Sequence, residues 1–404
     1  MTQTILTPTM INREAGRVLH QKANFIGTID RQYESKFAQT GAKIGTTLGI
    51  RLPNKYSVRT GKNLDAQDTQ ESSVTLTVAT QKGVDLNFST AELTMSIQDF
   101  SSRIIEPAMS VLVANIENDC LSMYKDVYQE VSDVGATMSY TDVLKGGKKL
   151  TDSLCPTPRT LMLTTQNTLD IVSATASLHN DPTKVSAQYR EGKLGDNFFG
   201  FKSVYENTMM PLHTTGTDDG TGDYLTNYPS AISNGATTLA IDTGAGTWKQ
   251  GDIFQIESCY AVHPETKVST GKLMTFVVTA DYTSGGSLSI SPAIYTSGAY
   301  QNVTGFADGK ALYKRESDES TAIGNAADYY VGLGYFKDAF AIVTADLEMP
   351  DGSVDFKARE VMDGISIRIV RQYSVNTDNQ PCRLDILYGY KTVRPEMAVR
   401  FGFN

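Results

Sequence analysis

Two runs of alternating apolar and polar residues lie close together near the C-terminal end, in residues 364–373 and 381–391. Successive side chains of a β-strand point to opposite faces, so this alternation is typical of half-buried strands. The linking residues 376–381 contain Asn, Asp and Pro, which favour turns and interrupt a strand ladder. We therefore predict a long antiparallel hairpin. Its apolar faces carry Ile365, Ile367, Ile369, Leu384, Ile386, Tyr388 and Tyr390.

The strongest helical pattern covers residues 99–131, where apolar residues recur every three or four positions. Pro107 fits the first turn of this helix, since a proline there lacks only a hydrogen bond that would go unmade. A helix from Pro107 to Val131 would be a rod of roughly 37 Å. Any amphipathic helix packed on a sheet would show the same spacing. The apolar stripe comprises Ile104, Ala108, Leu112, Ile116, Cys120, Met123, Val127 and Val131.

A two-stranded ribbon is predicted from two strand-like runs, residues 46–58 and 73–80, on either side of a polar tip. In the second run Val74, Leu76 and Val78 alternate with polar residues, mostly threonines. A ribbon of this length is marginal alone in water, so we expect it to lie on a surface. A solvated hairpin within one domain would have the same sequence pattern.

The charges of this ribbon are segregated along the chain, with no acidic residue between Gly41 and Lys62. Such segregation can steer docking between subunits, because complementary charges speed encounter and fix its register. We therefore take the charged side chains as candidates for contacts between subunits. They are Lys43, Arg51, Lys55, Arg59, Lys62, Asp65, Asp68 and Glu71.

The N-terminal residues 1–40 have the character of an arm. Modest amphipathic patterns predict helices in residues 12–22 and 24–37, with apolar residues at roughly helical spacing. The segment is too polar to hold a core by itself, so we expect it to pack on a neighbouring surface.

Mixed helical and strand patterns follow the long helix and return near the C-terminal third. Residues 326–344 resume this α/β character after an interruption. Helices are predicted for residues 140–153 and 165–178, a strand for residues 159–163, and a loop-rich part for residues 187–204.

The interruption begins at a polar, Gly-rich boundary, residues 214–223, and ends near Phe306. Between them short strands are separated by Gly, Ser and Asp turns, as in a small antiparallel barrel or sandwich. The predicted strands are residues 237–241, 252–257, 272–280 and 287–290.

Composition narrows the function classes. With 404 residues and 40% hydrophobic content, the chain can form two or three domains with a sizeable core. A formal net charge of −9 disfavours a general nucleic-acid binder. No segment has the roughly 20 consecutive apolar residues that a membrane-spanning helix needs, and no secretory signal is recognised at the N-terminus. We therefore expect no membrane association and place synthesis in the cytoplasm.

No motif predicts chemistry. The four histidines lie in different segments without metal-ligand spacing, and the four cysteines form no CxxC pair, so we expect buried free thiols. The residues around Lys148 fail the phosphate-loop pattern twice. Asp218, Asp219 and Asp223 do not follow the spacing of a calcium loop and are better explained as a solvated linker. We expect no catalytic residue, no cofactor and no metal, hence not an enzyme.

Residues 361–400 resemble the C-terminal end of the major capsid (coat) proteins of tailed bacteriophages. The hairpin and its exit, Tyr-Gly-Tyr-Lys-Thr-Val-Arg-Pro-Glu at residues 388–396, carry this resemblance. Segments 251–254 and 273–278 resemble the extra β domain of the coat family of short-tailed phages, the nearest match. Elsewhere the resemblance is one of architecture and order. It covers most of the chain and implies the Hong Kong 97-type fold.

The resemblance implies an α+β fold in which the extended loop reaches over the adjacent subunit and the long helix is the spine helix. Its segments are an N-terminal arm (1–40), an extended loop formed by a β-hairpin (41–88), a peripheral domain with the spine helix (89–134), the first part of an axial domain (135–216), an inserted β-barrel-like domain (217–308), the second part of the axial domain (309–350), and a C-terminal β-hairpin returning to the peripheral domain (351–404).

The function implied is that of a major capsid protein whose copies assemble, as hexamers and pentamers, into the icosahedral shell around the phage double-stranded DNA. The expected place is the virion, assembled in the host cytoplasm. No long acidic or helical segment precedes the capsid-like region, so a separate scaffolding protein is expected. A portal protein, a decoration protein and weak, non-specific contact with the packaged DNA complete the expected partners.

A second interpretation is a β-rich carbohydrate- or protein-binding module, as in adhesins. The Tyr-, Gly- and Thr-rich middle of the chain fits this class, because tyrosines offer stacking surfaces. It does not explain a ribbon, a long helix and a C-terminal hairpin in this order. A hydrolase ranks third, since no nucleophile motif occurs. Self-association separates the first two readings, because a coat chain forms shells and an adhesin does not.

Overall fold

The chain forms two compact units, each described here by itself. Unit one comprises Met1–Arg51, Ser73–Leu121 and Phe340–Val393; unit two comprises Leu52–Ser72, Ser122–Ala339 and Arg394–Asn404. The computed structural model describes residues 24–34, 47–59, 61–63, 71–89, 106–175, 200–217, 224–228, 230–314, 328–350, 356–362, 365–375 and 379–403.

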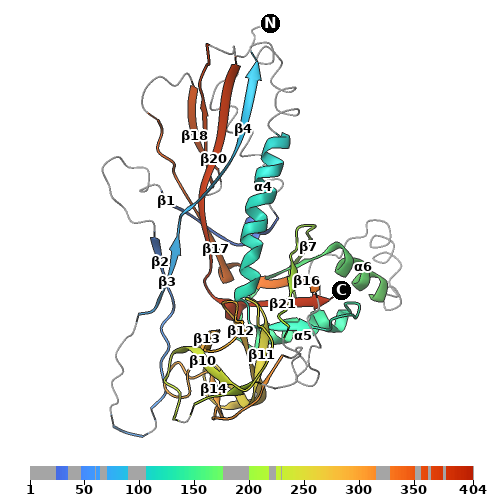
Figure 1. Cartoon of the computed structure of the whole chain (residues 1–404), viewed down its shortest axis with the longest axis vertical. Helices are drawn as coiled ribbons and strands as arrows, with labels where there is room; N and C mark the ends of the chain where they lie inside the picture. The colour runs from blue at the N-terminus through green and yellow to red at the C-terminus, as the bar shows by residue number, and fades with distance from the viewer. Residues whose placement is uncertain are drawn as a thin grey trace. The chain divides into compact units, whose positions relative to one another are not determined.

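Unit one is built on a six-stranded sheet in the order β1-β17-β20-β19-β18, with β4 also paired to β20 (Figure 1). Only β1 and β17 run parallel. The long strand β20 pairs with β4 along its first part and with β17 along its last. The strands are β1 (Asp30–Glu34), β4 (Thr80–Ser89), β17 (Phe340–Ala345), β18 (Phe356–Met362), β19 (Ile365–Arg371) and β20 (Asn379–Thr392).

The predicted C-terminal hairpin is confirmed as β19 and β20. Ile369 lies opposite Leu384 in an antiparallel register. The apolar residues of the alternating pattern are buried as predicted: the three isoleucines of β19 are buried together with Leu384 and Ile386. Apolar burial on one face thus fixes the register, since a slip by one residue would turn every side chain to the other face.

The long helix is shorter than its apolar pattern predicted. Helix α4 (Glu106–Leu121) has 16 residues, about 24 Å at 1.5 Å per residue. The 3-10 helix η4 (Ser122–Asp126) and strand β5 (Glu130–Ser132) follow directly. The predicted positions 123, 127 and 131 are all buried, but in other conformations. β-branched and aromatic residues after position 126, together with pairing in a sheet, outweigh helix propensity here.

The face of α4 that is buried packs on the sheet of unit one. Val113 and Ile116 of the helix line a small apolar cavity together with Ile342 of β17 and Ile386 of β20. Figure 1 shows α4 running alongside β4 and β20. The core of unit one therefore lies between this helix and one face of the sheet.

The predicted helix over residues 24–37 is wrong. The structure has one helical turn, α2 (Phe25–Thr28), followed by β1, which pairs in parallel with β17. Phe25 and Ile26 are buried in unit one, and the Phe25 ring lies 5.6 Å from that of Phe340. Residues 30–34 instead pair with β17. Gly27 lowers the helix propensity of the segment. The helix predicted for residues 12–22 lies outside the described residues.

The ribbon is confirmed as β2 (Thr47–Arg51) paired antiparallel with β3 (Ser73–Thr77). Leu48 lies opposite Leu76 and Ile50 opposite Val74, so the apolar side chains share one face. That face is the more buried one, with Leu76 fully enclosed. The base of the ribbon is therefore anchored in unit one.

Unit two contains a second six-stranded sheet in the order β5-β21-β16-β6-β7, with β8 also paired to β16. Its strands are β5, β6 (Arg159–Leu163), β7 (Ser203–Glu206), β8 (Leu212–Thr214), β16 (Asp328–Phe336) and β21 (Ala398–Phe403). The helices of unit two, α5 (Tyr140–Asp152) and α6 (Thr165–Thr175), confirm the two helices predicted here as far as the described residues reach. Gly146 lets α5 approach the sheet, because a Cβ there would lie 2.3 Å from Cζ of Phe401.

We predicted mixed helix and strand for residues 326–344, and the α-helix is wrong. This segment forms two strands, β16 and β17, joined by the 3-10 helix η5 (Lys337–Ala339). Its apolar residues lie too close together for an amphipathic helix to be told from a strand buried on both faces. The short helix η6 (Pro395–Met397) leads into β21, for which we predicted no strand.

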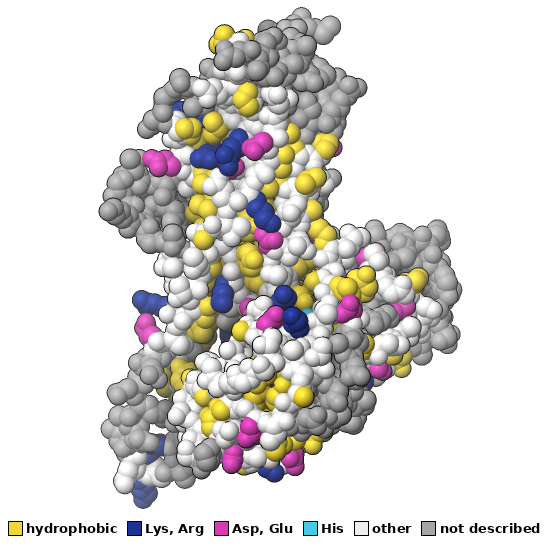
Figure 2. Space-filling view, viewed as in Figure 1, with side chains coloured by type: hydrophobic (Ala, Val, Ile, Leu, Met, Phe, Trp, Pro, Cys, Tyr) yellow, Lys and Arg dark blue, Asp and Glu magenta, His cyan; other side chains and the backbone are white. Residues whose placement is uncertain are grey.

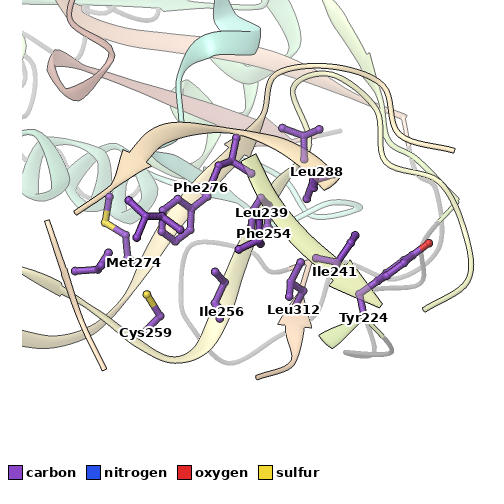
Figure 3. Close-up of a cluster of buried hydrophobic side chains, with 14 of the residues drawn as sticks. Tyr224, Leu239, Ile241, Phe254, Ile256, Cys259, Met274, Phe276, Leu288 and Leu312 are labelled. Atoms are coloured by element: carbon purple, nitrogen blue, oxygen red, sulfur yellow. The ribbon is translucent and has the colours of Figure 1, made fainter. Parts of the chain in front are cut away.

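The inserted region forms a seven-stranded sheet in the order β14-β11-β12-β13-β10-β9, with β15 also paired to β11. All four strands predicted here are confirmed. The strands are β9 (Leu225–Thr226), β10 (Ala236–Asp242), β11 (Ile253–Val262), β12 (Ser269–Val278), β13 (Ser287–Ile294), β14 (Val303–Thr304) and β15 (Leu312–Tyr313). Its core packs Leu239, Phe254, Phe276 and Leu288 among other apolar side chains (Figure 3).

Candidate assembly surface

The segment after β2 is extended and carries side chains of two kinds in alternation. Lys55, Ser57 and Arg59 alternate with Tyr56 and Val58. All five are exposed; Tyr56 retains 59% and Val58 93% of its accessible surface. Exposed apolar side chains beside cations are typical of a surface that a partner covers. We call residues 55–59 the ribbon edge.

The apolar members of the ribbon edge were missed by sequence reasoning, which followed only the charges. The signal was present, because Tyr56 and Val58 continue the period of two that predicted the strand. What the period could not show is that Tyr56 and Val58 stay exposed in the single chain.

Lys55 does not project freely into solvent. Its Nζ lies 5.6 Å from the centre of the Tyr300 ring, in a cation–π contact with the inserted sheet's β13–β14 connection. The same place holds Lys267, whose Nζ donates to the carbonyl of Gln301 at 3.2 Å. Burial and, second, the charge of Lys55 lower the pKa of Lys267. Lys55 and Lys267 thus bind neighbouring residues, Tyr300 and Gln301, and are close enough for the charge of one to act on the other.

Arg59 is bonded within the ribbon tip. Its Nη1 donates to the carbonyl oxygens of Gly61 and of Asn63, the latter at 2.8 Å. Its guanidinium therefore binds the backbone of the residues that follow it, Gly61 and Asn63. Arg51, Lys62 and Glu71 are exposed. Figure 2 shows basic side chains along this part of the molecule, at lower left.

Three of the predicted contact residues, Lys43, Asp65 and Asp68, lie outside the described residues, as do Asp218, Asp219 and Asp223. The structure brings Lys55 to Tyr300 and Arg59 to the carbonyl groups of Gly61 and Asn63.

All four cysteines are free and buried, as predicted. Within the parts that the structure describes, no three His, Cys, Asp or Glu side chains are grouped to hold a metal ion. None of the helices described combines the length and apolar character needed to cross a membrane. A group of charges that sequence reasoning did not predict is buried beside the start of β11 and comprises Glu130, Asp252, Lys314 and Arg400.

Comparison with protein families gives a match that spans almost the whole chain. The family model described as "P22 coat protein - gene protein 5" matches residues 26–402. No curated protein matches the chain.

Solved structures that resemble the chain are distant in sequence. One from Mycobacterium phage Che8 is 11% identical, with a TM-score of 0.42, covering 91% of this chain and 88% of that one. The capsid structure of the cyanophage P-SCSP1u is 9% identical, with a TM-score of 0.47, covering 95% and 89%. A virus-like particle from Pyrococcus furiosus is 6% identical, with a TM-score of 0.40, covering 97% of each chain. From the family match, the chain belongs to the P22 coat protein family and is a major capsid protein of the virion shell of a tailed phage.

Proposed function

We propose that copies of this chain join through the ribbon edge, which docks on a neighbouring copy in the shell. The observation that carries the proposal is the alternation of exposed cations with Tyr56 and Val58 in residues 55–59. A single copy leaves these apolar side chains in water. In a shell the neighbouring copy would cover them and would meet the cations with carboxylates.

Assembly by such a surface needs no strong single contact. In a closed shell each copy makes several weak contacts at once, and contacts within one assembly add because the partners are already held close together. Cations at the rim fix register and speed encounter, whereas the apolar side chains supply most of the association energy. Hexamers and pentamers of the same chain are the arrangement that we propose.

The sheets support a domain assignment whose boundaries follow the strands. We assign the sheet of unit one with α4 to the peripheral domain, the second sheet with α5 and α6 to the axial domain, and the seven-stranded sheet to the inserted domain. Pairing of β15 with β11 carries the inserted domain to Tyr313, beyond residue 308. Because β21 pairs with β16, we assign it to the axial domain as well.

The partners beyond the chain itself are also proposals. A separate scaffolding protein would place the first copies, a portal protein would occupy one vertex, and a decoration protein would bind the outer surface. The net charge of −9 supports only weak contact with packaged DNA. The role is structural and not catalytic, in keeping with membership of a coat protein family.

The test removes the ribbon cations together. We expect Arg51→Ala/Lys55→Ala/Arg59→Ala to fold, with unchanged circular dichroism, and to form few or no closed shells when expressed with its scaffolding partner. A control with equal loss of charge is Lys148→Ala/Lys202→Ala/Lys391→Ala, whose three lysines are exposed and lie outside residues 46–80 of the ribbon. Negative-stain electron microscopy counts the shells. Normal shell numbers in the ribbon variant would refute the proposal.

A second variant tests the apolar part. Tyr56→Ser/Val58→Ser keeps every charge and removes the apolar side chains, so it should also reduce shell formation. If only the charge variant fails, the ribbon edge acts by electrostatics alone and the apolar contact is wrong.

A further inference from the structure

One buried carboxylate, that of Asp252, lies where the chain enters and leaves the inserted sheet. Its side chain is fully enclosed. Oδ1 accepts a hydrogen bond from Nε2 of His213 at 3.0 Å. Oδ2 accepts from the backbone N–H groups of Gly216 and Lys249, each at 2.9 Å, and lies 3.3 Å from Nζ of Lys314. Four donors therefore converge on one carboxylate.

These donors come from different parts of unit two. His213 belongs to β8, a strand of the axial sheet. Gly216 lies on the chain that runs from β8 toward the inserted sheet, and Lys314 follows β15, the last strand of that sheet. Lys314 also donates from Nζ to the carbonyl of Gly216 at 3.0 Å. The carboxylate thus holds together the incoming chain, the outgoing chain and the axial sheet.

A second side chain of the axial sheet also binds the turn that precedes β11. Arg400 of β21 donates from Nη2 to the carbonyl of Gly251, the residue before Asp252. Arg400 also forms an ion pair with Glu130 of β5, whose carboxylate accepts from the Tyr329 hydroxyl at 3.2 Å. The turn before β11 is therefore fixed by one side chain from β8 and by another from β21.

His213 is itself held in place. The hydroxyl of Tyr124 in η4 lies 3.0 Å from Nδ1 of His213. The ring of Tyr329 meets the imidazole edge-on, with centroids 5.2 Å apart. The imidazole therefore cannot turn away from Asp252 without losing both contacts.

Close packing leaves no room for larger residues at this junction. Gly251 has φ +99°, and a Cβ there would lie 3.0 Å from Cε1 of His213. At Gly216 a Cβ would lie 2.0 Å from the carbonyl oxygen of Thr247. Both glycines permit contacts that any side chain would block.

A buried ion pair is weak evidence for stability, because desolvation offsets much of the attraction between its charges. Its better-supported use is to specify one arrangement among several that apolar contacts would allow. We propose that Asp252 is the positioning residue that fixes the inserted sheet on the axial sheet, so that every copy presents it in the same orientation. This inference rests on the proposed assembly of copies into a shell, where equivalent contacts need equivalent subunits.

The test replaces the charge and keeps the shape, with Asp252→Asn in the full-length chain. Hydrogen exchange is measured on the unassembled protein. We expect the amides of Gly216 and Lys249, which donate to Oδ2, to exchange at least tenfold faster, whereas the amides of β11 and β12 keep their protection. The matched control is Asp281→Asn, which also loses a carboxylate bonded to a backbone N–H and to Lys249, but in a turn within the inserted sheet.

A disulfide between the incoming chain and the inserted region should restore the slow amide exchange that Asp252→Asn loses. Thr217 on the incoming chain and Thr247 in the inserted region bond to each other through their hydroxyls at 3.1 Å. We expect a disulfide between Thr217→Cys and Thr247→Cys to return the exchange of Gly216 in Asp252→Asn to within about twofold of wild type. The same tether in a wild-type background is the reference.

The outcomes separate clearly. Unchanged exchange at Gly216 in Asp252→Asn overturns the proposal. Loss of protection throughout β11 and β12 also overturns it, because Asp252 would then act on the stability of the whole sheet. If Asp252→Asn does not fold, Lys314→Met takes its place, since it removes one donor and keeps the carboxylate. The ribbon variant should leave Gly216 unaffected, so its failure to assemble would be independent of this result.

In assembled shells the same variant has a second readout. Electron cryomicroscopy of Asp252→Asn shells should show weaker density for the inserted sheet than for the axial sheet, and the tether should restore it. Equal density for both sheets in the untethered variant would contradict a positioning role.

Discussion

The hydroxyl of Tyr388 donates a hydrogen bond of 2.5 Å to the carboxylate of Asp119, which joins strand β20 to helix α4. Lys82 of β4 forms an ion pair with the same carboxylate at 2.7 Å. One acidic side chain on the helix thus binds two strands of the sheet. The aromatic ring of Tyr388 lines the apolar cavity beneath α4, so its hydroxyl is the polar end of a buried contact.

We expect Tyr388→Phe to destabilise unit one by about 1.5–3 kcal/mol, the usual range for a hydrogen bond to a charged group. The ring and its packing remain, so only the bond is lost. Urea unfolding followed by circular dichroism measures the change. Tyr390→Phe is the control, because its ring stacks on that of Tyr388 and its hydroxyl has no polar contact among the residues that the structure describes. A change below about 0.5 kcal/mol in Tyr388→Phe, as for surface substitutions, would show that the bond contributes little.

Gly389 sets how closely the ribbon approaches the sheet. A Cβ at this position would lie 2.1 Å from the carbonyl oxygen of Thr77. Backbone cannot yield as a side chain can, so Gly389→Ala should cost roughly 1–3 kcal/mol, as overpacking does. Gly49→Ala is the control, because a Cβ at Gly49 in β2 would meet nothing within 4 Å. Thermal unfolding compares the two. Equal effects would mean that the ribbon base is not held at Gly389.

The cysteines should resist labelling until the chain unfolds. Burial raises the pKa of Cys259 to about 12, and it raises the pKa of Cys382 to about 12 as well. At pH 8 only about one in 10⁴ such thiols is a thiolate, the reactive form. We therefore expect no fast reaction with a disulfide reagent in the native protein and four reactive thiols in urea. A fast native phase would show that at least one thiol is accessible.

Asp252 should make stability depend on pH in the acidic range. Burial alone would raise its pKa, but the hydrogen bond from His213, the charge of Lys314 and the Lys249 amide outweigh burial and hold the pKa below its ordinary 3.8. The unfolded chain then binds the proton more readily, so stability from Asp252 is present above pH 3.8 and is lost as the pH falls further. The groups around it are His213, Lys314, Tyr124, Tyr329, Glu130 and Arg400.

The measurement is the free energy of unfolding between pH 7 and pH 3. We expect the difference between wild type and Asp252→Asn to be constant at the upper end and to shrink below pH 4. A difference that grows as the pH falls would have the wrong sign and would refute the assignment.

The sequence patterns predicted those parts of the fold whose burial is local and periodic. The alternation of Ile365, Ile367 and Ile369 predicted β19, and the ribbon and inserted strands followed from the same rule. The C-terminal end of α4 could not be predicted from the sequence. Val127 and Val131 are buried and keep helical spacing, although neither lies in a helix. Burial alone does not distinguish a helix from the turn and strand that replace it.

The candidate site shows a similar division. Charge segregation pointed to the ribbon, and Lys55 and Arg59 do lie there in exposed positions. The Asp252 group could not be found in this way, since His213 is 39 positions from Asp252, and Gly216 is 98 positions from Lys314. No spacing rule joins such distant residues, and each charge looks ordinary in its own segment.

Strand β21 lies between β5 and β16, in the interior of the six-stranded sheet of unit two. Its residues 398–403 follow all the other strands of that sheet in the sequence. During synthesis β5 and β16 must therefore wait with unpaired edges until these residues leave the ribosome. This sheet can close only after β21, its last strand in the sequence, has been translated, so chaperones that shield open strand edges have an interval in which to act on each nascent copy.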